Sequence, residues 1–254
     1  MPISQRLKKL IRSLHQKQYR DQNGLFVAEG ERLCSELVQS DYIPEIIVIK
    51  DSPSSDILES VEKFADKGIP VYTAPKHQFD QICDTKNPQG ILAVVNDKEF
   101  DIMPDESFLA LDGIADPGNV GTIIRTAEWF GIKQVFLGRD CADRYSPKTV
   151  RSTMGSIFRT HVIEYPDLRE LISSEFDKFE IYGAALDAGK SLKQIKHGKK
   201  FGIVFGSEAH GISEELTATV KTKFRIEGNG SAESLNVATS VGISLYHFMI
   251  GPKS

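Results

Sequence analysis

The chain has 254 residues, of which 40% are apolar and 26% are charged, and its formal net charge is −4 at pH 7. These values are ordinary for a globular protein and exclude a collagen, a disordered tail, a coiled coil and a small disulfide-bonded scaffold. The length predicts two domains of about 100–150 residues each. Because the chain is slightly acidic as a whole, any site for a polyanion has to be a local basic surface.

The first twenty residues predict a basic amphipathic helix. Within residues 3–15 an apolar stripe recurs at helical spacing, formed by Ile3, Leu7, Leu10, Ile11 and Leu14. No acidic residue precedes Asp21, whereas six basic residues do, namely Arg6, Lys8, Lys9, Arg12, Lys17 and Arg20. Two interpretations of this charge stay open, a solvated helix face and a surface that faces phosphate groups.

The same charged start lacks the apolar core of a secretory signal, and no segment approaches the roughly 18 apolar residues of a membrane helix. The cysteines Cys34, Cys83 and Cys141 lie far apart without C-x-x-C spacing, so they predict neither a disulfide framework nor a zinc site. The six histidines form no metal-binding motif. We expect a cytoplasmic protein with reduced thiols and no metal ion.

Short apolar runs alternate with helical patterns between Phe26 and Val95, which is typical of a small α/β domain. The expected strands are Glu45–Ile49, Val71–Thr73 and Ile91–Val95, and the expected helices are Glu29–Ser40 and Asp56–Lys67. The polar and acidic stretch that follows, Asn96–Ser107, predicts a linker between two domains.

The second half of the chain alternates in the same way and predicts a buried parallel sheet. Its expected strands are Phe108–Leu111, Gln134–Leu137, Thr160–Ile163, Ile181–Ala184 and Phe201–Phe205, with helices near 119–130, 147–156 and 166–176. The last expected helix, Ser234–Met249, is apolar around much of its circumference and therefore needs partners on more than one side. Because Ala238, Gly242 and Ser244 would let a neighbour approach closely, we expect a second subunit there.

The first of three chemically suggestive motifs is Leu111–Gly131 (LDGIADPGNVGTIIRTAEWFG). A strand ends in a turn, and a helix is expected to begin near Asn119 as its N-cap. Arg125 lies off the buried stripe of this helix, beside the strand ends where ligands of open α/β sheets bind. An ordinary capped helix with a solvated arginine is the alternative. The spacing is not G-x-G-x-x-G, so a nicotinamide-dinucleotide oxidoreductase is a weak hypothesis.

The other two motifs also follow apolar strands or turns. Phe201–Gly211 (FGIVFGSEAHG) leads a strand into Gly206-Ser207-Glu208, which is typical of backbone bent around a ligand and also of a tight turn. The third motif begins at Arg225 (RIEGNGSAESLN) and leads through a glycine-rich loop to Ser234-Leu235-Asn236. A helix amino end with free N–H groups suits a phosphate or a polar nucleoside, and an N-cap on a core helix is the alternative.

Read together, the three motifs resemble those of the SpoU (TrmH-type) family of RNA 2′-O-ribose methyltransferases in the SPOUT superfamily. The matching patterns are Asn119-x-Gly121-x-x-x-Arg125, Gly206-x-Glu208-x-x-Gly211 and Ser234-Leu235-Asn236, in this order. Gly24–Leu37 and Asn87–Val95 are similar to the substrate-binding domain often fused ahead of the catalytic domain, and Ser146–Phe158 is similar to a further family segment. The resemblance covers nearly the whole chain.

This resemblance implies an α/β fold with a trefoil-knotted, parallel-sheet methyltransferase domain preceded by a small α/β domain like ribosomal protein L30e. The expected boundaries are 1–98 for the RNA-binding domain, 99–106 for the linker and 107–254 for the methyltransferase domain with its C-terminal knot. The family implies S-adenosylmethionine as methyl donor, RNA as substrate and a homodimer. A full auxiliary domain favours 23S ribosomal RNA over transfer RNA, and neither a membrane nor DNA is an expected partner.

The resemblance also implies roles for single residues. Arg125 matches the catalytic arginine, which Asn119 would orient. Ser234 and Asn236 would help to fix the ribose-phosphate of the substrate. Glu208 would hold either the subunit interface or an arginine. The methyl donor would be lined by Gly206, Ile226 and Leu235, with Leu186 as a further neighbour.

The chain departs from the family pattern at the start of the third motif, which usually begins Ile-Pro-Met. Here it reads Ile226-Glu227-Gly228, so a proline is missing and a charge is added near the donor. This departure puts donor affinity in doubt and leaves open an RNA-binding or assembly protein that has lost methyl transfer. Three basic stretches are candidates for following RNA phosphates, namely the first twenty residues, Arg144–Arg159 and Lys190–Lys200.

Overall fold

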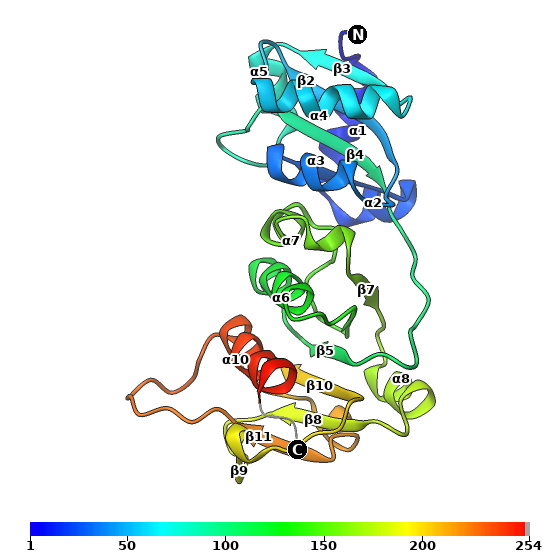
Figure 1. The fold of residues 1–254 in the computed structure, drawn as a ribbon. Coiled ribbons are helices and arrows are strands. Elements are labelled where there is room, and N and C mark those ends of the chain that lie inside the picture. The colour runs from blue at the N-terminus through cyan, green and yellow to red at the C-terminus, as the bar shows by residue number, and fades with distance from the viewer. Residues whose placement is uncertain (252–254) are drawn as a thin grey trace. The chain divides into compact units, whose positions relative to one another are not determined.

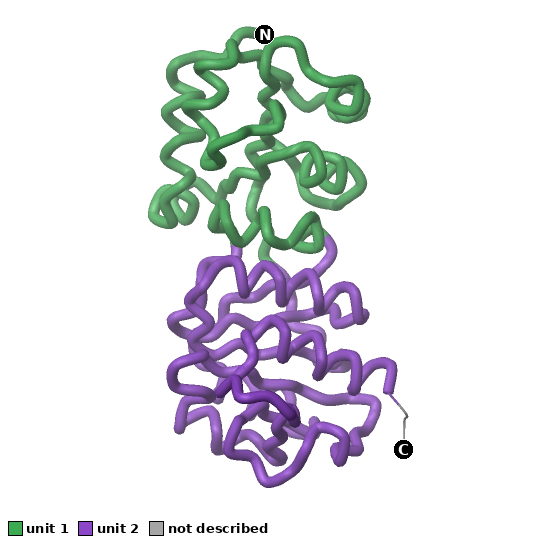
Figure 2. The backbone as a smooth tube through the Cα atoms, turned by 90° about the vertical axis from the view of Figure 1, so that its left-hand side faces the viewer, with its two compact units in different colours: residues 1–99, 145–158 green, residues 100–144, 159–254 purple. Residues whose placement is uncertain are grey.

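The computed structural model describes residues 1–251 of the chain. By its internal contacts the chain divides into two compact units, drawn in different colours in Figure 2. Unit 1 comprises residues 1–99 and 145–158, and unit 2 comprises residues 100–144 and 159–254. Within the described part of the chain, every helix is too short or too polar to cross a membrane.

Unit 1 is built on a four-stranded mixed sheet in the order β1-β4-β2-β3. Strand β4 pairs antiparallel with β1 and β2, whereas β2 and β3 are parallel. The strands and helices (Figure 1) are β1 (Leu25–Glu29), β2 (Pro44–Lys50), β3 (Val71–Ala74) and β4 (Ile91–Asn96), with α1 (Gln5–Ser13), α2 (Lys17–Asn23), α3 (Glu31–Val38), α4 (Ser55–Asp66) and α5 (Lys76–Ile82). The sequence predicted three of these strands and missed β1, whose residues it placed partly in a helix.

The N-terminal helical segment packs its apolar stripe into the core of unit 1. Ile3, Ile11 and Leu14 are buried with Val48 and Phe79 in one cluster. Ser4 caps α1 by accepting a hydrogen bond from the backbone N of Leu7. The single helix expected over residues 3–15 is therefore real but shorter, and a second helix, α2, follows it.

Residues 145–158 complete the core of unit 1, although they come from the second half of the chain. They form α7 (Pro147–Ser152) and the 3₁₀ helix η1 (Ser156–Phe158). The ring of Tyr145 stacks on Phe26 with centroids 4.2 Å apart, and Phe158 contacts Tyr42 edge-on. A helix was expected here, but its packing on unit 1 depends on these long-range aromatic contacts, which no local pattern reveals.

Unit 2 holds a seven-stranded sheet in the order β7-β6-β5-β10-β8-β11-β9, and every pairing in it is parallel. Its strands are β5 (Phe108–Asp112), β6 (Gln134–Leu137), β7 (His161–Glu164), β8 (Glu180–Ala184), β9 (Lys190–Ser191), β10 (Phe201–Gly206) and β11 (Thr222–Arg225). Its helices are α6 (Pro117–Trp129), α8 (Leu168–Glu175), α9 (Glu214–Thr217), α10 (Val237–Ile250) and the 3₁₀ helix η2 (Leu192–Gln194). The predicted α/β class with a parallel sheet is confirmed.

Helix α10 is buried against the sheet and against α6. Its Phe248 contacts the rings of Tyr182 and Phe201 at centroid distances of 4.9 Å. A side chain added at Gly242 would meet Thr126 of α6 at 3.7 Å, so the small residue admits a helix of the same chain. At Gly242 the close neighbour is therefore α6 of the same chain.

Two helix starts differ from the expectation, and in both cases the capping residue explains the difference. Helix α6 is capped by Asp116, whose Oδ1 accepts a hydrogen bond from the backbone N of Asn119 over 2.9 Å. Asn119 is thus not the N-cap. Helix α10 begins at Val237 because Asn236 caps it, accepting from the backbone N of Ala238 over 2.9 Å. Ser234 therefore lies ahead of the helix.

Candidate active site

The three motifs meet in one hydrogen-bonded cluster of unit 2, which we call the Asn119 bridge. Asn119 Nδ2 donates to Glu208 Oε1 over 2.7 Å, and Asn236 Nδ2 donates to Asn119 Oδ1 over 2.9 Å. These partners are 89 and 117 positions apart in the sequence. The bridge therefore joins the amino ends of α6 and α10 to the loop that follows β10.

Capping by Asp116 leaves the amide of Asn119 free to reach other segments, whereas Asn236 both caps its helix and joins the bridge. Because Asp116 caps α6, the side chain of Asn119 is not needed by its own helix and reaches two other segments. Asn236 uses both ends of its amide, since Oδ1 caps α10 and Nδ2 donates to Asn119. Sequence reasoning missed Asp116, although Asp-Pro at a helix start is a recognisable signal for an N-cap followed by Pro at the first position.

Gly206 ends β10 at a place where no side chain fits. A Cβ added there would lie 2.0 Å from the backbone carbon of Gly211 and 2.2 Å from the nitrogen of Ile212. The intervening loop is closed by two backbone hydrogen bonds between Ser207 and Gly211, of 3.1 and 2.9 Å. The glycine is thus required by the return of the chain itself, and this closed loop presents Glu208 to the bridge.

The structure does not bring Arg125 and Ser234 into the bridge. Arg125 is exposed on α6, six residues after Asn119, and has no hydrogen-bond or ion-pair partner among residues 1–251. Ser234 is also exposed. Asn119 bonds to Glu208 and Asn236, and no bond joins it to Arg125 within the described chain. The roles expected for Arg125 and Ser234 stay predictions.

The residues expected to line the methyl donor follow three adjacent parallel strands. Gly206 ends β10, Leu186 follows β8 and Ile226 follows β11, and these strands are neighbours in the sheet. Their carboxyl ends therefore share one edge, where ligands of open α/β sheets bind. Leu186 is 71% exposed and Leu235 is 44% exposed. An exposed apolar side chain such as Leu186, with loop backbone at the same edge, suits a nucleoside, which offers an apolar ring face and polar edges.

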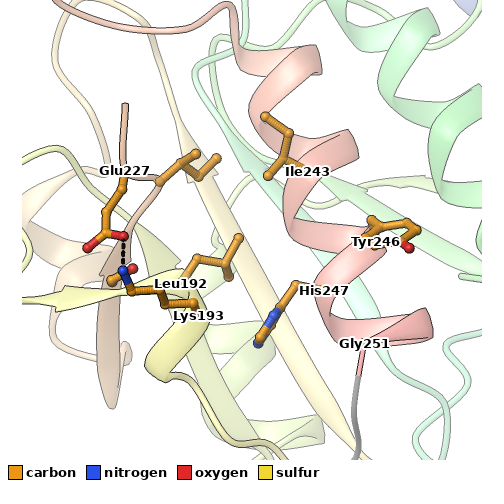
Figure 3. Close-up of a pocket in the computed structure, with 9 residues that line it drawn as sticks. Leu192, Lys193, Glu227, Ile243, Tyr246, His247 and Gly251 are labelled. Atoms are coloured by element: carbon orange, nitrogen blue, oxygen red, sulfur yellow. Dashed lines mark ion pairs between the residues drawn. The ribbon is translucent and has the colours of Figure 1, made fainter. Parts of the chain in front are cut away.

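A cavity of about 340 Å³ lies beside this edge (Figure 3). Of the three predicted donor contacts it includes Ile226 and neither Gly206 nor Leu235. The remaining lining residues come from the segment around β9 and η2 and from α10, namely Ser191, Leu192, Lys193, Glu227, Ile243, Tyr246, His247 and Gly251. The structure therefore places Ile226 at a hollow that α10 closes on one side.

Glu227, the residue that departs from the family pattern, is held by an ion pair. Lys193 Nζ lies 2.6 Å from Glu227 Oε2, and both residues line the cavity (Figure 3). The hydrogen bond from Lys193 lowers the pKa of the Glu227 carboxyl, and Ser191 adds to the effect. The pair links the loop after β11 to η2. Glu227 stands where the family usually has a proline, so here an ion pair restrains the loop in place of the proline ring.

If this pair restrains the donor loop, Glu227→Gln should raise the Kd for S-adenosylmethionine by about two- to five-fold, the range typical of an exposed ion pair. Titration calorimetry measures the change. The double variant Lys193→Glu with Glu227→Lys restores opposite charges and should recover most of the affinity. Unchanged binding in the single variant would mean that the loop needs no restraint at this position.

The half-buried thiol of Cys141 has a structural role beside the first motif. Cys141 Sγ donates to the carbonyl of Leu111 over 3.1 Å and accepts from the backbone N of Ile114 over 3.4 Å. Burial raises the pKa of Cys141 to about 11, so the thiol stays protonated at neutral pH. A protonated, hydrogen-bonded thiol is a poor nucleophile and supports the turn after β5.

The bridge makes a testable claim about charge. Asn119→Asp puts a carboxylate opposite Glu208, so we expect the loss of a hydrogen bond to a charged group, about 1.5–3 kcal/mol or roughly ten- to a hundred-fold in donor affinity. Adding Glu208→Gln restores a donor opposite the new carboxylate and should recover binding. Calorimetry with S-adenosylmethionine measures the affinity of each variant. If all variants bound the donor equally well, the bridge would have no part in donor binding.

A parallel sheet with helices, in which the polar side chains of three distant motifs meet at two helix amino ends and the loop after β10, is typical of an α/β enzyme. Comparison with known proteins identifies the family. The profile of the SpoU rRNA Methylase family matches residues 106–246, and the profile of the MRM3-like substrate binding domain matches residues 5–93. The chain belongs to the SpoU rRNA methylase family, which confirms the resemblance found in its motifs and the enzyme class that it implied.

Individual relatives cover almost the whole chain. The 23S rRNA (guanosine(2553)-2′-O)-methyltransferase RlmP of Bacillus subtilis is 32% identical over 93% of both chains. An AdoMet-bound rRNA methyltransferase from Sinorhizobium meliloti is 28% identical, with a TM-score of 0.85 over 97% of this chain and 95% of its own. A TrmH-family protein from Porphyromonas gingivalis is 31% identical, with a TM-score of 0.84 over 98% and 99%.

Proposed function

We propose that this chain transfers a methyl group from S-adenosylmethionine to the ribose 2′-hydroxyl of a guanosine in 23S ribosomal RNA. The observation that carries the proposal is the Asn119 bridge, because it joins residues of the three family motifs by hydrogen bonds. The choice of RNA is supported by the likeness to RlmP, which extends along 93% of each chain. A cytoplasmic location is part of the proposal, since the substrate is ribosomal.

In this proposal the protein binds the donor mainly through backbone and apolar contacts. Gly206, Ile226 and Leu235 would hold it at the strand ends, with Leu186 beside them. When bound, the donor supplies an electrophilic methyl carbon on a sulfonium, which is already a good leaving group. The chain then has to hold the ribose hydroxyl in line with this carbon, and such positioning can contribute several orders of magnitude to a rate.

Arg125 serves in this proposal as a fixed cation. An arginine has a pKa above about 12 and is hardly ever deprotonated in a protein, so it is a poor general base. Its planar fork of donors suits a phosphate and a developing alkoxide. Arg125 would therefore bind the phosphate next to the target ribose and stabilise charge on the attacking oxygen, while the proton leaves through that phosphate. Ser234 and Asn236 would fix the same ribose-phosphate.

We also propose that the loops after β10 and β11 form the trefoil knot of the family and that the chain acts as a homodimer. The knot is supported by the Asn119 bridge, which holds the start of α10 against the loop after β10. The dimer is supported by an exposed apolar face on two helices that pack together, α6 and α10. This face, called the α6–α10 face below, consists of Trp129 (81% exposed), Tyr246 (61%), Ile250 (62%) and Ile243 (40%).

A change in the α6–α10 face should affect the oligomeric state. Trp129→Glu introduces a charge into the apolar face, so we expect a dimer of the wild-type chain to become a monomer at micromolar concentration. Multi-angle light scattering measures the mass. Leu58→Glu alters a 46% exposed apolar residue of α4 and should leave the mass unchanged. A monomeric wild-type chain would rule out the dimer proposal.

The main experiment incubates the full chain with methyl-labelled S-adenosylmethionine and 23S ribosomal RNA, then maps ribose methylation by nuclease digestion. The expected product is one 2′-O-methylguanosine. Transfer RNA in a parallel reaction should receive no label. Label on a base would overturn the 2′-O assignment, and donor binding without transfer to any RNA would favour a binding or assembly protein.

A further inference from the structure

Helix α1 presents a row of unneutralised positive charges. Arg6, Lys9 and Arg12 follow each other at intervals of three residues, and all three side chains are exposed. The side chains of these three residues have no hydrogen-bond or ion-pair partner among residues 1–251, whereas Lys8 Nζ donates to Gln78 Oε1. We call Arg6, Lys9 and Arg12 the α1 basic face.

In helices α2 to α5 of unit 1, by contrast, charged side chains form ion pairs within the helix. Each of α2, α3, α4 and α5 contains an ion pair between residues four apart, namely Lys17–Asp21, Arg32–Glu36, Glu59–Lys63 and Lys76–Asp80. Such pairs stabilise a helix, and like charges at this spacing destabilise it. In α1 the corresponding positions give Lys8 and Arg12, two cations, and no acidic residue in the first turn.

Two features of this arrangement are unfavourable for the stability of α1, whereas Arg12 lies in the last turn, where the helix carboxyl end favours a cation. Arg6 lies in the first helical turn, where the partial positive charge of the helix amino end repels a cation. Arg6, Lys9 and Arg12 also repel each other along one side of the helix. A helix that keeps three mutually repelling cations without an acidic neighbour is suited to an external anion, because binding such an anion removes the repulsion.

The second basic stretch of the sequence is largely neutralised, and the third is neutralised only in part. In the second stretch, Arg151 pairs with Asp84 and Arg159 with Glu128, at 2.7 and 3.1 Å. In the third, Lys193 pairs with Glu227, and Lys200 pairs with Asp105 at 2.5 Å. The other lysines of this stretch, Lys190, Lys196 and Lys199, are exposed and have no ion-pair partner among residues 1–251. Among residues 1–251, the cations of the three stretches without a hydrogen-bond or ion-pair partner are therefore Arg6, Lys9 and Arg12 in the first and Lys190, Lys196 and Lys199 in the third. Those of the first follow one another along a single helix, whereas those of the third do not.

We propose that the α1 basic face is a docking surface for the phosphate backbone of the RNA substrate, an inference that rests on the proposed function. The charge is complementary to phosphates, and the three residues span about 9 Å along the helix axis at 1.5 Å per residue, which is enough to contact successive phosphates. A lipid surface fits less well, because the apolar side of α1 is packed in the core of unit 1 and is not available to insert into a bilayer.

The test compares two triple variants of the full chain that lose the same charge. Arg6→Gln, Lys9→Gln and Arg12→Gln remove the α1 basic face. Arg32→Gln, Lys63→Gln and Lys76→Gln remove three paired cations of the same unit. Affinity for a 23S ribosomal RNA transcript is measured by filter binding at several salt concentrations, and melting temperature is measured alongside. The basic-face variant should bind about ten- to a hundred-fold more weakly, with a salt slope smaller by about 2.

Stability separates a docking role from a structural one. The basic-face variant should melt at the same temperature as the wild-type chain or higher, while the paired-cation variant should melt slightly lower and bind RNA normally. Equal loss of RNA affinity in both variants would mean that only the net charge of the chain matters, and would overturn the proposal. So would wild-type affinity and salt slope in the basic-face variant, or binding to phosphatidylglycerol vesicles that depends on the same face.

Methyl transfer is measured in parallel with each variant, which keeps this proposal distinct from the function on which it rests. A wild-type chain that methylates the transcript, together with a basic-face variant that binds it normally, overturns the docking surface alone. A wild-type chain that binds RNA through the basic face and transfers no methyl group overturns the proposed reaction and leaves the surface intact.

Discussion

Replacing Arg125 with alanine is expected to lower kcat for RNA methylation about 10²- to 10³-fold, the usual cost of removing one preorganised donor that stabilises transition-state charge. The Arg125 side chain is exposed and has no partner among residues 1–251, so the melting temperature should not change. A radiometric assay with saturating S-adenosylmethionine measures the rate, and calorimetry should find donor affinity near that of the wild-type chain.

The conservative variant and a matched control sharpen this test. Arg125→Lys keeps the charge but loses the planar fork of donors, so it should recover only a small part of the rate. Arg169→Ala removes an exposed arginine of α8 that has no proposed role and should turn over normally. Full turnover by Arg125→Lys would contradict bidentate binding, and full turnover by Arg125→Ala would remove this residue from the reaction.

Gly206→Ala is expected to weaken donor binding by at least about ten-fold and to destabilise the fold by about 1–3 kcal/mol, the usual cost of overpacking. The added Cβ would meet backbone atoms of Gly211 and Ile212 at 2.0–2.2 Å, and backbone cannot rotate away as a side chain can. The loop must then shift, and Glu208 moves away from Asn119. Calorimetry and denaturant unfolding measure the two effects.

Gly198→Ala is the matched control, since an added Cβ at Gly198 meets nothing within 4 Å. It should bind the donor and unfold like the wild-type chain. If Gly206→Ala also behaved in this way, the loop after β10 would be more adaptable than its closed hydrogen bonds imply, and its proposed part in donor binding would fail.

Elements with strong local patterns could be predicted from the sequence. The continuous apolar runs of β5, β6 and β10 are buried on both faces in the parallel sheet, as such runs indicate. Strand β11 was missed because only Phe224 of its four residues is buried, so no apolar run marks it. Its pairing with β8 makes it a strand, and that partner is about 40 residues earlier in the chain.

The sequence likewise predicted the residues of the site but not all of the contacts between them. The motifs drew attention to Asn119, Glu208 and Asn236, and the structure joins these three by hydrogen bonds. The sequence did not predict that Asp116 would replace Asn119 as the N-cap, nor that Lys193 would hold Glu227. Each of these outcomes depends on which of several possible polar partners lies within about 3 Å.

By itself, the sequence determined the α/β class, the parallel sheet and the family, because apolar periodicity and motif spacing are properties of neighbouring residues. Only the tertiary structure decided that residues 145–158 complete unit 1 and that Asn119 bridges two helices and a loop. It also decided that Arg6, Lys9 and Arg12 of α1 find no ion-pair partner among residues 1–251. These features depend on contacts between distant segments. A hydrogen bond or an ion pair forms only where folding brings both partners together, so one segment alone cannot specify it.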